Sequence, residues 1–424
     1  MTDSRQQVRG AARAATGNEP SGPVILLPRR RPGYLGPVHI MQLLLAETAI
    51  IAILATLTRG IVAITAACAG ATVLLLVTLG RRNGRWWVER RMMIWRYNRR
   101  RRASPARYSS DPRLAALSVL APGLTVEDIP AADGTRVGVA QDDAGWFAVA
   151  ARSTGAAMCD DPGERLPLEV LATALADANQ PGAVLQVVRH TVPAPGLDTH
   201  PASPADQSYR QLLAEFGAAP VPLDAIPLDT VTWIAVRLDR RALAEAGADI
   251  GTDRDAAPAP AVVAALLRGA AKSLRRVGIP CQVLDAAGLV DALARSCDLD
   301  LTAPGSAPAA RREKWTTWHS ARLAHRCFWI RSWPPVEEAA ALLDRLAATP
   351  AAVTNVTMIM VPDNDNDLID LRGLVRVAAP AADLDQICQT ITDLAVQAQA
   401  ELFPLDGEQA PAVYASAPTG GGVR

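Results

Sequence analysis

Two long apolar runs lie close together near the start of the chain. Residues 40–57 (IMQLLLAETAIIAILATL) and 61–79 (IVAITAACAGATVLLLVTL) are separated by only three residues. A helix needs about 20 apolar residues to cross the hydrocarbon core of a bilayer. A signal peptide has one shorter apolar core and no second span after it. The pattern therefore predicts a transmembrane hairpin of two helices.

A basic and aromatic segment follows the second apolar run at once. Residues 79–102 (LGRRNGRWWVERRMMIWRYNRRRR) contain ten arginines, three tryptophans and a tyrosine, with Glu89 as the one acidic residue. This mixture suits either nucleic acid, where arginine pairs with phosphate and rings stack on bases, or the headgroup layer of a membrane. Because the segment follows a predicted span, we favour a juxtamembrane helix against lipid headgroups and partner subunits. Its expected contact residues are Trp86, Trp87, Trp95, Tyr97, Arg99, Arg100, Arg101 and Arg102.

Charge is distributed unevenly along a chain that is neutral as a whole, with 43 basic and 43 acidic residues. Residues 1–102 hold 17 basic and four acidic side chains, so the rest of the chain holds 26 and 39. An acidic region without a second basic patch argues against nucleic acid as a partner. Arginines flank both outer ends of the predicted hairpin, while its turn holds only Arg59. By the positive-inside rule, we expect both termini in the cytoplasm.

Beyond the basic segment, strand and helix patterns follow one another. Residues 230–239 (TVTWIAVRLD) predict a strand, and residues 260–278 predict a long helix that leads to the short strand PCQVLD. Strands separated by such helices imply crossover connections in a sheet covered by helices. The predicted fold is α/β, with a transmembrane hairpin before a cytosolic mixed α/β domain. The predicted segments are a disordered cytosolic tail (1–37), the hairpin (38–80), a basic juxtamembrane segment and linker (81–112), the α/β domain (113–403) and a flexible tail (404–424).

One acidic and one amide residue interrupt the first apolar run. Glu47 falls in its middle, and Gln42 lies more than one turn before it. An ionised side chain at the centre of a span costs about 2.5–3.5 kcal/mol on insertion scales. Such residues line a proton or ion path, face a partner helix, or are kept neutral by burial. Two spans cannot build a pore, so we favour contact of Glu47 and Gln42 with a partner helix.

The sequence offers few signals of catalysis. It contains no phosphate-binding G-x-x-x-x-G-K-[ST] motif, no G-x-G-x-x-G after a strand and no G-x-S-x-G nucleophile motif. Its six cysteines lack C-x-x-C spacing, which is typical of buried thiols in a reducing compartment. We therefore expect no catalytic residue, no metal and no cofactor.

Two weaker features carry catalytic hypotheses. His319 and His325 lie six residues apart at a helix-to-strand junction. They could share a metal or catalytic site, but no third ligand lies nearby in the sequence. Asp298 and Asp300 have the D-x-D spacing with which many glycosyltransferases hold a metal and a sugar nucleotide. The same spacing also occurs in a turn after a helix, and we favour that interpretation.

A third feature is an acidic segment between two predicted strands. Asp363, Asp365 and Asp367 resemble the opening of a calcium loop. Leu368 and Leu374 occupy the positions where such a loop has its glycine and its glutamate. We expect a solvated loop.

The order of several short strings resembles a known family. These are SYRQLL (208–213), TWIAVRLD (232–239), AALLRGAAKSLRRVGIPCQVLDAAGL (264–289) and REKW (312–315). Together with the two apolar runs and the arginine-rich stretch, they resemble EccE, the membrane subunit of the type VII (ESX) secretion system of actinobacteria. The resemblance implies a structural role in the bacterial inner membrane beside the EccB, EccC and EccD subunits, with EccC as the ATPase. It carries over no catalytic residues.

Two hypotheses of different classes follow. The first is a structural subunit of a secretion complex, held in the lipid bilayer by the hairpin. The alternative is a membrane-tethered α/β enzyme, such as a nucleotide-sugar transferase that uses Asp298 and Asp300. The two hypotheses differ in how the detergent-extracted protein should migrate. A subunit migrates within a large assembly, whereas a tethered enzyme migrates alone.

Overall fold

The computed structural model divides the chain into two compact units. The smaller unit comprises residues 28–104, and the larger comprises residues 105–424 together with 1–27. The residues that the structure describes are 11–13, 34–35, 38–56, 60–79, 81–82, 85–102, 112–131, 134–152, 166–193, 228–244, 258–299, 312–363 and 368–421.

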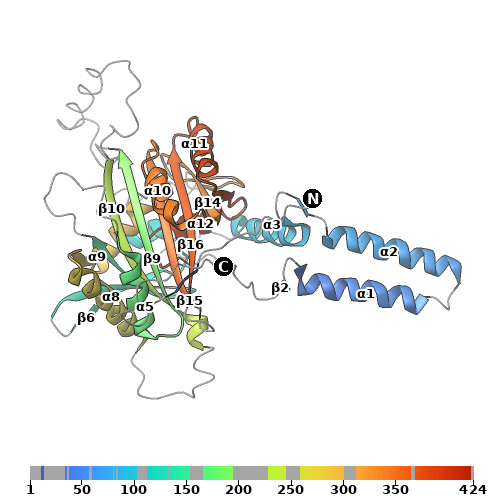
Figure 1. Cartoon of the computed structure of the whole chain (residues 1–424), viewed down its shortest axis with the longest axis horizontal. Coiled ribbons are helices and arrows are strands. Elements are labelled where there is room, and N and C mark those ends of the chain that lie inside the picture. Colours follow the sequence, from blue (N-terminus) through green and yellow to red (C-terminus); the bar gives the residue numbers. More distant parts are fainter. Residues whose placement is uncertain are drawn as a thin grey trace. The chain divides into compact units, whose positions relative to one another are not determined.

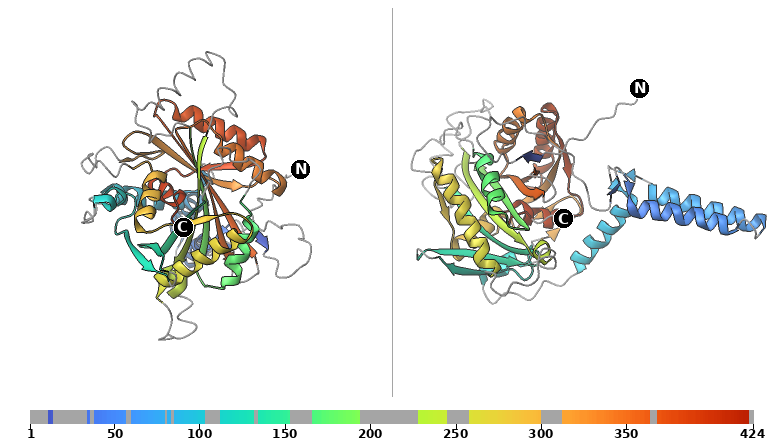
Figure 2. Two further views of the ribbon diagram at one scale, coloured as in Figure 1. Left: turned by 90° about the vertical axis from the view of Figure 1, so that its left-hand side faces the viewer. Right: turned by 60° about the horizontal axis from the view of Figure 1, so that its bottom comes forward.

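The smaller unit contains a pair of helices at the positions of the two apolar runs. α1 (Ile40–Thr56) and α2 (Ile61–Leu79) lie side by side (Figure 2). The connection between them includes Gly60, whose φ of +89° suits a residue without a side chain. Ala49 and Ala71 are buried, and small residues of this kind let two helices approach closely. When only the described residues are counted, no helix is long and apolar enough to cross a membrane.

Short strands and a third helix complete the smaller unit. They are β2 (Tyr34–Leu35) paired with β3 (Val38–His39), β4 (Arg81–Arg82) paired with β5 (Arg85–Trp86), and α3 (Trp87–Arg102). Of the tail expected to be disordered, residues 1–37, the structure describes only β2 and β1 (Ala11–Arg13). The prediction of disorder is wrong at these two strands, because each finds a backbone partner, β3 and β16 respectively. The rest of that tail and residues 103–111 of the predicted linker lie outside the described residues.

The larger unit is built on one 13-stranded sheet (Figure 1). Its order is β12-β13-β14-β16-β15-β9-β10-β8-β7-β6, with β1 beside β16, β11 beside β8 and β17 beside β14. The strands are β6 (Thr125–Pro130), β7 (Arg136–Asp142), β8 (Gly145–Arg152), β9 (Ala183–Pro193), β10 (Leu228–Asp239), β11 (Cys281–Val283), β12 (Arg312–Glu313), β13 (Trp318–His319), β14 (Ala324–Ser332), β15 (Val353–Asp363), β16 (Leu368–Ala379) and β17 (Glu401–Pro404).

Neighbouring strands among the described residues pair antiparallel, yet the predicted crossovers are present. β8 continues through α5 (Leu168–Ala178) to β9, and β10 lies between these two strands in the sheet. In the same way, β14 continues through α10 (Val336–Ala347) to β15, with β16 between them. Each crossover therefore joins two strands of the same direction with one antiparallel strand inserted.

Helices cover both faces of the sheet, which gives the unit three layers (Figure 2). One face packs against α5 and α8 (Ala259–Arg276) and, further along, against α10 and α11 (Leu384–Gln397). The other face packs against α4 (Pro112–Leu117), α9 (Ala286–Ser296) and α12 (Gln409–Ser416). Central strands therefore carry buried side chains on both faces.

The predicted flexible tail from residue 404 onward is wrong over residues 404–421. β17 pairs with β14, and α12 buries Ala412 and Val413 in the core. The chain then continues to Gly420, whose N–H donates to Gln186 Oε1 at 2.6 Å. A composition rich in glycine and proline suggested flexibility, but these apolar side chains and backbone donors all find partners.

Candidate functional site

The outer surface of the α1–α2 pair is apolar. Seven of its large side chains are between 50 % and 79 % exposed, namely Leu44, Ile50, Ile51, Leu54, Ile61, Val62 and Val73. A helix pair in water normally turns its apolar stripe inward and exposes polar residues. This surface instead suits an apolar environment, either hydrocarbon or the helices of a partner.

Four threonine hydroxyls among the described side chains of these two helices donate within their own helix. The Oγ1 atoms of Thr48 and Thr72 donate to the carbonyls four residues earlier at 2.7 and 2.8 Å. Those of Thr56 and Thr65 donate three residues back at 2.8 and 3.0 Å. Such bonds remove the need for water at each hydroxyl, as an apolar environment requires.

Glu47 lies on the outward side of α1. Its spacing from Leu44, Ile51 and Leu54 places all four on one helix face, and all four are exposed. Ala49, by contrast, is buried. The carboxylate is thus available to a group outside the hairpin. The side chain of Gln42 lies outside the described part of α1.

α3 presents aromatic and basic groups on its exposed side. Trp95 is 60 % exposed, and the guanidinium of Arg99 lies 5.5 Å from the centroid of its ring. Met93 and Tyr97, one turn apart, are buried on another side of the helix. The last turn holds the four predicted arginines, Arg99, Arg100, Arg101 and Arg102, where positive charge favours the negative end of a helix dipole.

Trp86 and Trp87 lie at the end of β5 and the start of α3, and their side chains are outside the described residues. Met92 and Trp95 line an open hollow together with Arg91 and Arg96. The arrangement suits the headgroup layer of a membrane, where rings and arginines meet both apolar chains and phosphates.

The D-x-D pair does not form an open carboxylate site at Asp298. This side chain is 3 % exposed, and its oxygens accept from Ser320 Oγ at 2.5 Å and from Arg322 Nη2 at 2.7 Å. Its backbone has a φ of +51° in the turn after α9, as the turn interpretation expects. Asp300 lies outside the described residues.

His319 lies on β13 and His325 on the neighbouring strand β14, so the predicted helix-to-strand junction is wrong, and the two rings have different surroundings. His325 is fully buried, and burial holds its pKa well below the ordinary value, as do Arg376 and His319. Its ring packs edge-on against Trp318 at 4.9 Å. His319 is half-buried and lies 3.1 Å from Thr317 Oγ1. Within the described part of the chain, no three His, Cys, Asp or Glu side chains are placed to hold a metal ion.

The acidic segment lies between β15, which ends at Asp363, and β16, which begins at Leu368. Asp365 and Asp367 fall in residues 364–367, outside the described residues.

Four of the five described cysteines are buried as free thiols, as the sequence predicts. Burial raises the pKa of Cys297 to about 11 and that of Cys327 to about 12. A thiol with so high a pKa is a poor nucleophile at neutral pH. These side chains therefore serve as small apolar groups of the core.

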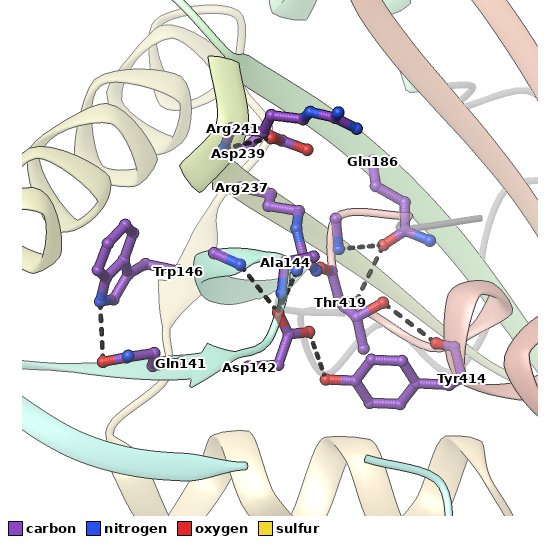
Figure 3. Close-up of polar contacts among 12 residues, drawn as sticks. Gln141, Asp142, Ala144, Trp146, Gln186, Arg237, Asp239, Arg241, Tyr414 and Thr419 are labelled. Carbon is purple, nitrogen blue, oxygen red and sulfur yellow. Dashed lines mark hydrogen bonds and ion pairs between the residues drawn. The ribbon is translucent and has the colours of Figure 1, made fainter. Parts of the chain in front are cut away.

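A buried polar network lies beneath the segment that follows α12 (Figure 3). Asp142 forms an ion pair with Arg237 and accepts from Tyr414 Oη at 2.9 Å. Arg237 Nη1 also donates to the Thr419 carbonyl at 2.7 Å. Burial raises the pKa of Tyr414 well above its ordinary value, and so does Asp142. The tyrosine therefore stays protonated, and the network holds structure in place without supplying a base or a nucleophile.

A second polar network is centred on Asn355. In the orientation that satisfies both sides of its amide, the nitrogen donates to His190 Nδ1 at 2.7 Å and the oxygen accepts from Arg376 and from Ser296 Oγ. Burial lowers the pKa of His190 to about 3. The imidazole is therefore neutral, with Nδ1 as an acceptor.

Sequence reasoning missed the residues at the centre of both networks. Gln186, Asn355, Arg237 and Arg376 are polar residues within strands that are otherwise apolar, and all four are fully buried. Their inward position in runs such as AVLQVV and TWIAVRL was a usable signal, because a buried polar group needs a specific partner.

Residues 226–330 match the family model described as "Putative type VII ESX secretion system translocon, EccE". This confirms the resemblance to EccE over about a quarter of the chain. Three of the four strings that carry the resemblance fall inside the match, and SYRQLL, at 208–213, falls before it and outside the described residues. No curated protein matches the chain.

Proposed function

We propose that this protein is a structural membrane subunit of a type VII secretion complex in the bacterial inner membrane. The α1–α2 hairpin anchors it as a multi-pass protein with both termini in the cytoplasm, and the α/β unit contacts other subunits there. The expected partners are EccB, EccC and EccD. The match to a translocon family over residues 226–330 supports a role within an export assembly.

One observation carries the mechanism. Glu47 lies in the middle of an exposed apolar stripe on α1, between Leu44 and Ile51. A carboxylate facing hydrocarbon is costly, so this position favours a polar group on a neighbouring transmembrane helix. The hairpin would then join the complex through that contact, with the apolar surface around it excluding lipid.

The tethered-enzyme alternative receives less support. Asp298 is engaged by Ser320 and Arg322, so its carboxylate is not free to bind a metal and a sugar nucleotide. Buried thiols and a buried tyrosine with raised pKa values supply no nucleophile. A role in assembly, without catalysis or a cofactor, accounts better for these features.

A substitution in the full chain tests the proposal. Glu47→Leu should lower the yield of the tagged complex purified from native membranes while leaving hydrogen-exchange protection of the α/β unit unchanged. Ile51→Leu, at the next exposed position of the same stripe, is the matched control. Asp300→Ala addresses the alternative without disturbing Asp298. Full complex yield with Glu47→Leu, together with loss of secretion from intact Asp300→Ala complexes, would replace the structural proposal with the enzymatic one.

A further inference from the structure

The larger unit contains the same succession of elements twice. The first set is β7, β8, α5, β9, β10, α8, β11 and α9, and the second is β13, β14, α10, β15, β16, α11, β17 and α12. In the sheet, the order outward from the centre is β9-β10-β8-β7 on one side and β15-β16-β14-β13 on the other. The short strands β11 and β17 attach to β8 and β14 at equivalent places.

Strand register relates the two sets residue by residue. Gln186 pairs with Ala235, which pairs with Val149 on the next strand. Asn355 pairs with Arg376, which pairs with Cys327. Gln186 therefore corresponds to Asn355, and Val149 to Cys327.

A backbone bond confirms this correspondence independently of the sheet centre. Leu284 N donates to the Val149 carbonyl at 3.0 Å, and Leu405 N donates to the Cys327 carbonyl at 3.0 Å. Each leucine is followed by an aspartate, Asp285 or Asp406, before the next helix begins.

The hairpin turns at the two ends also correspond. Asp142 Oδ1 accepts from the N–H groups two and three residues later, at 2.9 and 3.1 Å. Ser320 Oγ accepts from the N–H groups two and three residues later, at 3.4 and 2.9 Å. The same register that equates Val149 with Cys327 equates Asp142 with Ser320.

The axis relating the two sets lies at the centre of the sheet, between β9 and β15. Val188 pairs with Thr357, and the register maps each of these residues onto the other. The flanking pairs Gln186–Ile359 and His190–Asn355 also exchange. The relationship is thus a twofold rotation, as in a symmetric dimer.

Polar side chains in each set form hydrogen bonds with the end of a helix in the other set. Gln186, in the first set, donates to the Ala415 carbonyl in the last turn of α12 at 2.7 Å and accepts from Thr419 N, three residues after that helix, at 3.0 Å. Asn355, in the second set, accepts from Ser296 Oγ at the end of α9 in the first set. The two contacts are reciprocal.

Arginines on the corresponding strands make a similar exchange, although the register places them two residues apart, since Arg376 corresponds to Ala235. Arg237 on β10 donates to the Thr419 carbonyl after α12, and Arg376 on β16 donates to the Ser296 carbonyl at the end of α9. The donors Gln186, Arg237 and Arg376 are fully buried, so these bonds to the carbonyls are made away from water.

Residual sequence similarity supports a common origin. Residues 180–192 (QPGAVLQVVRHTV) and 349–361 (TPAAVTNVTMIMV) are identical at five of 13 positions in the register set by the strands. The outer helices differ more, since α8 exposes Lys272 and Arg275 where α11 exposes Asp385 and Asp393. Similarity is therefore retained at the centre and lost at the surface.

We infer that the α/β unit is an internal duplication of two repeats, residues 136–299 and 318–421, joined by a reciprocal exchange of helix ends. Each repeat binds the other along its central strand, which is β9 in the first repeat and β15 in the second. The inference does not depend on the proposed function. It requires that the two repeats hold each other without the covalent connection between them.

Cleavage of the full chain tests this requirement. A protease site inserted after Gly305, between the repeats, should give two fragments that stay together on size exclusion under native conditions. Gln186→Leu and Asn355→Leu should each weaken the association of the fragments by about tenfold, because each leaves buried groups of the other repeat without partners. Gln282→Leu, at an exposed position of β11, is the matched control and should change nothing.

The result that overturns the inference is separation of the fragments on cleavage, or an effect from only one of the two substitutions. Hydrogen exchange in the uncut wild-type chain provides a second measurement that does not rely on a variant folding. The amides of Thr419 and Gly420 should exchange as slowly as those of β9 and β15. Exchange at the rate of an exposed loop would contradict the exchange of helix ends.

Discussion

Arg237 and Asp142 form an ion pair in which only 2 % and 10 % of the two side chains are exposed. Arg237→Met leaves Asp142 as a buried carboxylate without its cation. Removing one partner of a buried pair costs about 3–5 kcal/mol, so we expect a loss of that order in the free energy of unfolding. Chemical unfolding of the purified full chain, followed by tryptophan fluorescence, measures it.

The control is Arg189→Met. Arg189 pairs with Asp344 at 2.6 Å, but the side chains are 41 % and 38 % exposed, so the expected loss is below about 1 kcal/mol. Equal effects of the two substitutions would show that the network in Figure 3 does not stabilise the fold through burial of its charges.

Gly420 is held against Arg237. Its φ is +78°, and a Cβ atom there would lie 2.2 Å from Arg237 Cβ. Gly420→Ala should therefore cost about 1–3 kcal/mol for overpacking in addition to the strain of a positive φ. Gly278→Ala is the matched control, because Gly278 has a φ of +88° but nothing within 4 Å of the added atom. The difference between the two losses, measured by thermal unfolding, isolates the contact; no difference would place the segment after α12 away from Arg237.

Stability should fall in acid through His190. Burial lowers the pKa of its imidazole to about 3 in the folded chain, with further lowering by Arg376 and Arg295. Between the unfolded pKa of about 6.5 and about 3, only the unfolded chain binds the proton, so the free energy of unfolding decreases by up to about 1.4 kcal/mol per pH unit. As far as His190 is concerned, the free energy of unfolding therefore has its full value above pH 6.5, and it decreases as the pH falls.

His190→Asn should reduce that slope, because the asparagine oxygen keeps an acceptor for Asn355 but does not titrate. His319→Asn is the control, since this half-buried ring has a smaller lowering of its pKa. Unfolding titrations from pH 7 to pH 4 give both slopes. An unchanged slope in His190→Asn would mean that the imidazole is protonated in the fold.

Local patterns predicted the local elements of this chain. The apolar run at 61–79 coincides with α2, and the alternating run at 230–239 lies within β10, because both signals depend only on neighbouring residues. The segment after α12 was mispredicted for the opposite reason. Its Gly420 N–H is satisfied by Gln186, 234 residues away in the chain, and no local pattern records such a partner.

The candidate site was predictable to a similar extent. Composition placed Glu47 within an apolar run, but only the helix geometry shows it on the outward side. The duplication remained hidden because the repeats are similar in register and hydrogen bonding while most of their side chains differ. Antiparallel insertion of β10 and β16 into the crossovers was likewise set by pairing between distant strands.

The proposed topology makes a labelling prediction. With both termini in the cytoplasm, a cysteine introduced as Thr58→Cys, between the two apolar runs, should react with a membrane-impermeant maleimide added to intact cells. A cysteine introduced as Ser104→Cys should react only after the cells are opened. The unsubstituted chain, which keeps Cys68, gives the background. Strong external labelling at Ser104→Cys would invert or abolish the proposed hairpin.

The exposed arginines at the end of α3 should bind anionic headgroups. In the full chain reconstituted into nanodiscs, we expect hydrogen exchange of α3 amides to be slower with phosphatidylglycerol than with phosphatidylcholine alone. Each arginine near the surface contributes about 1 kcal/mol, so replacing Arg99, Arg101 and Arg102 with glutamine should reduce this protection by about a hundredfold. Replacing Lys272, Arg275 and Arg276, which are exposed on α8, removes equal charge from the other unit and should leave α3 unaffected.

Raising the salt concentration should weaken the protection in the unsubstituted chain, since the attraction is screened. Equal exchange in both lipids, together with salt-dependent binding of DNA or RNA that the α3 substitutions abolish, would assign this helix to nucleic acid instead.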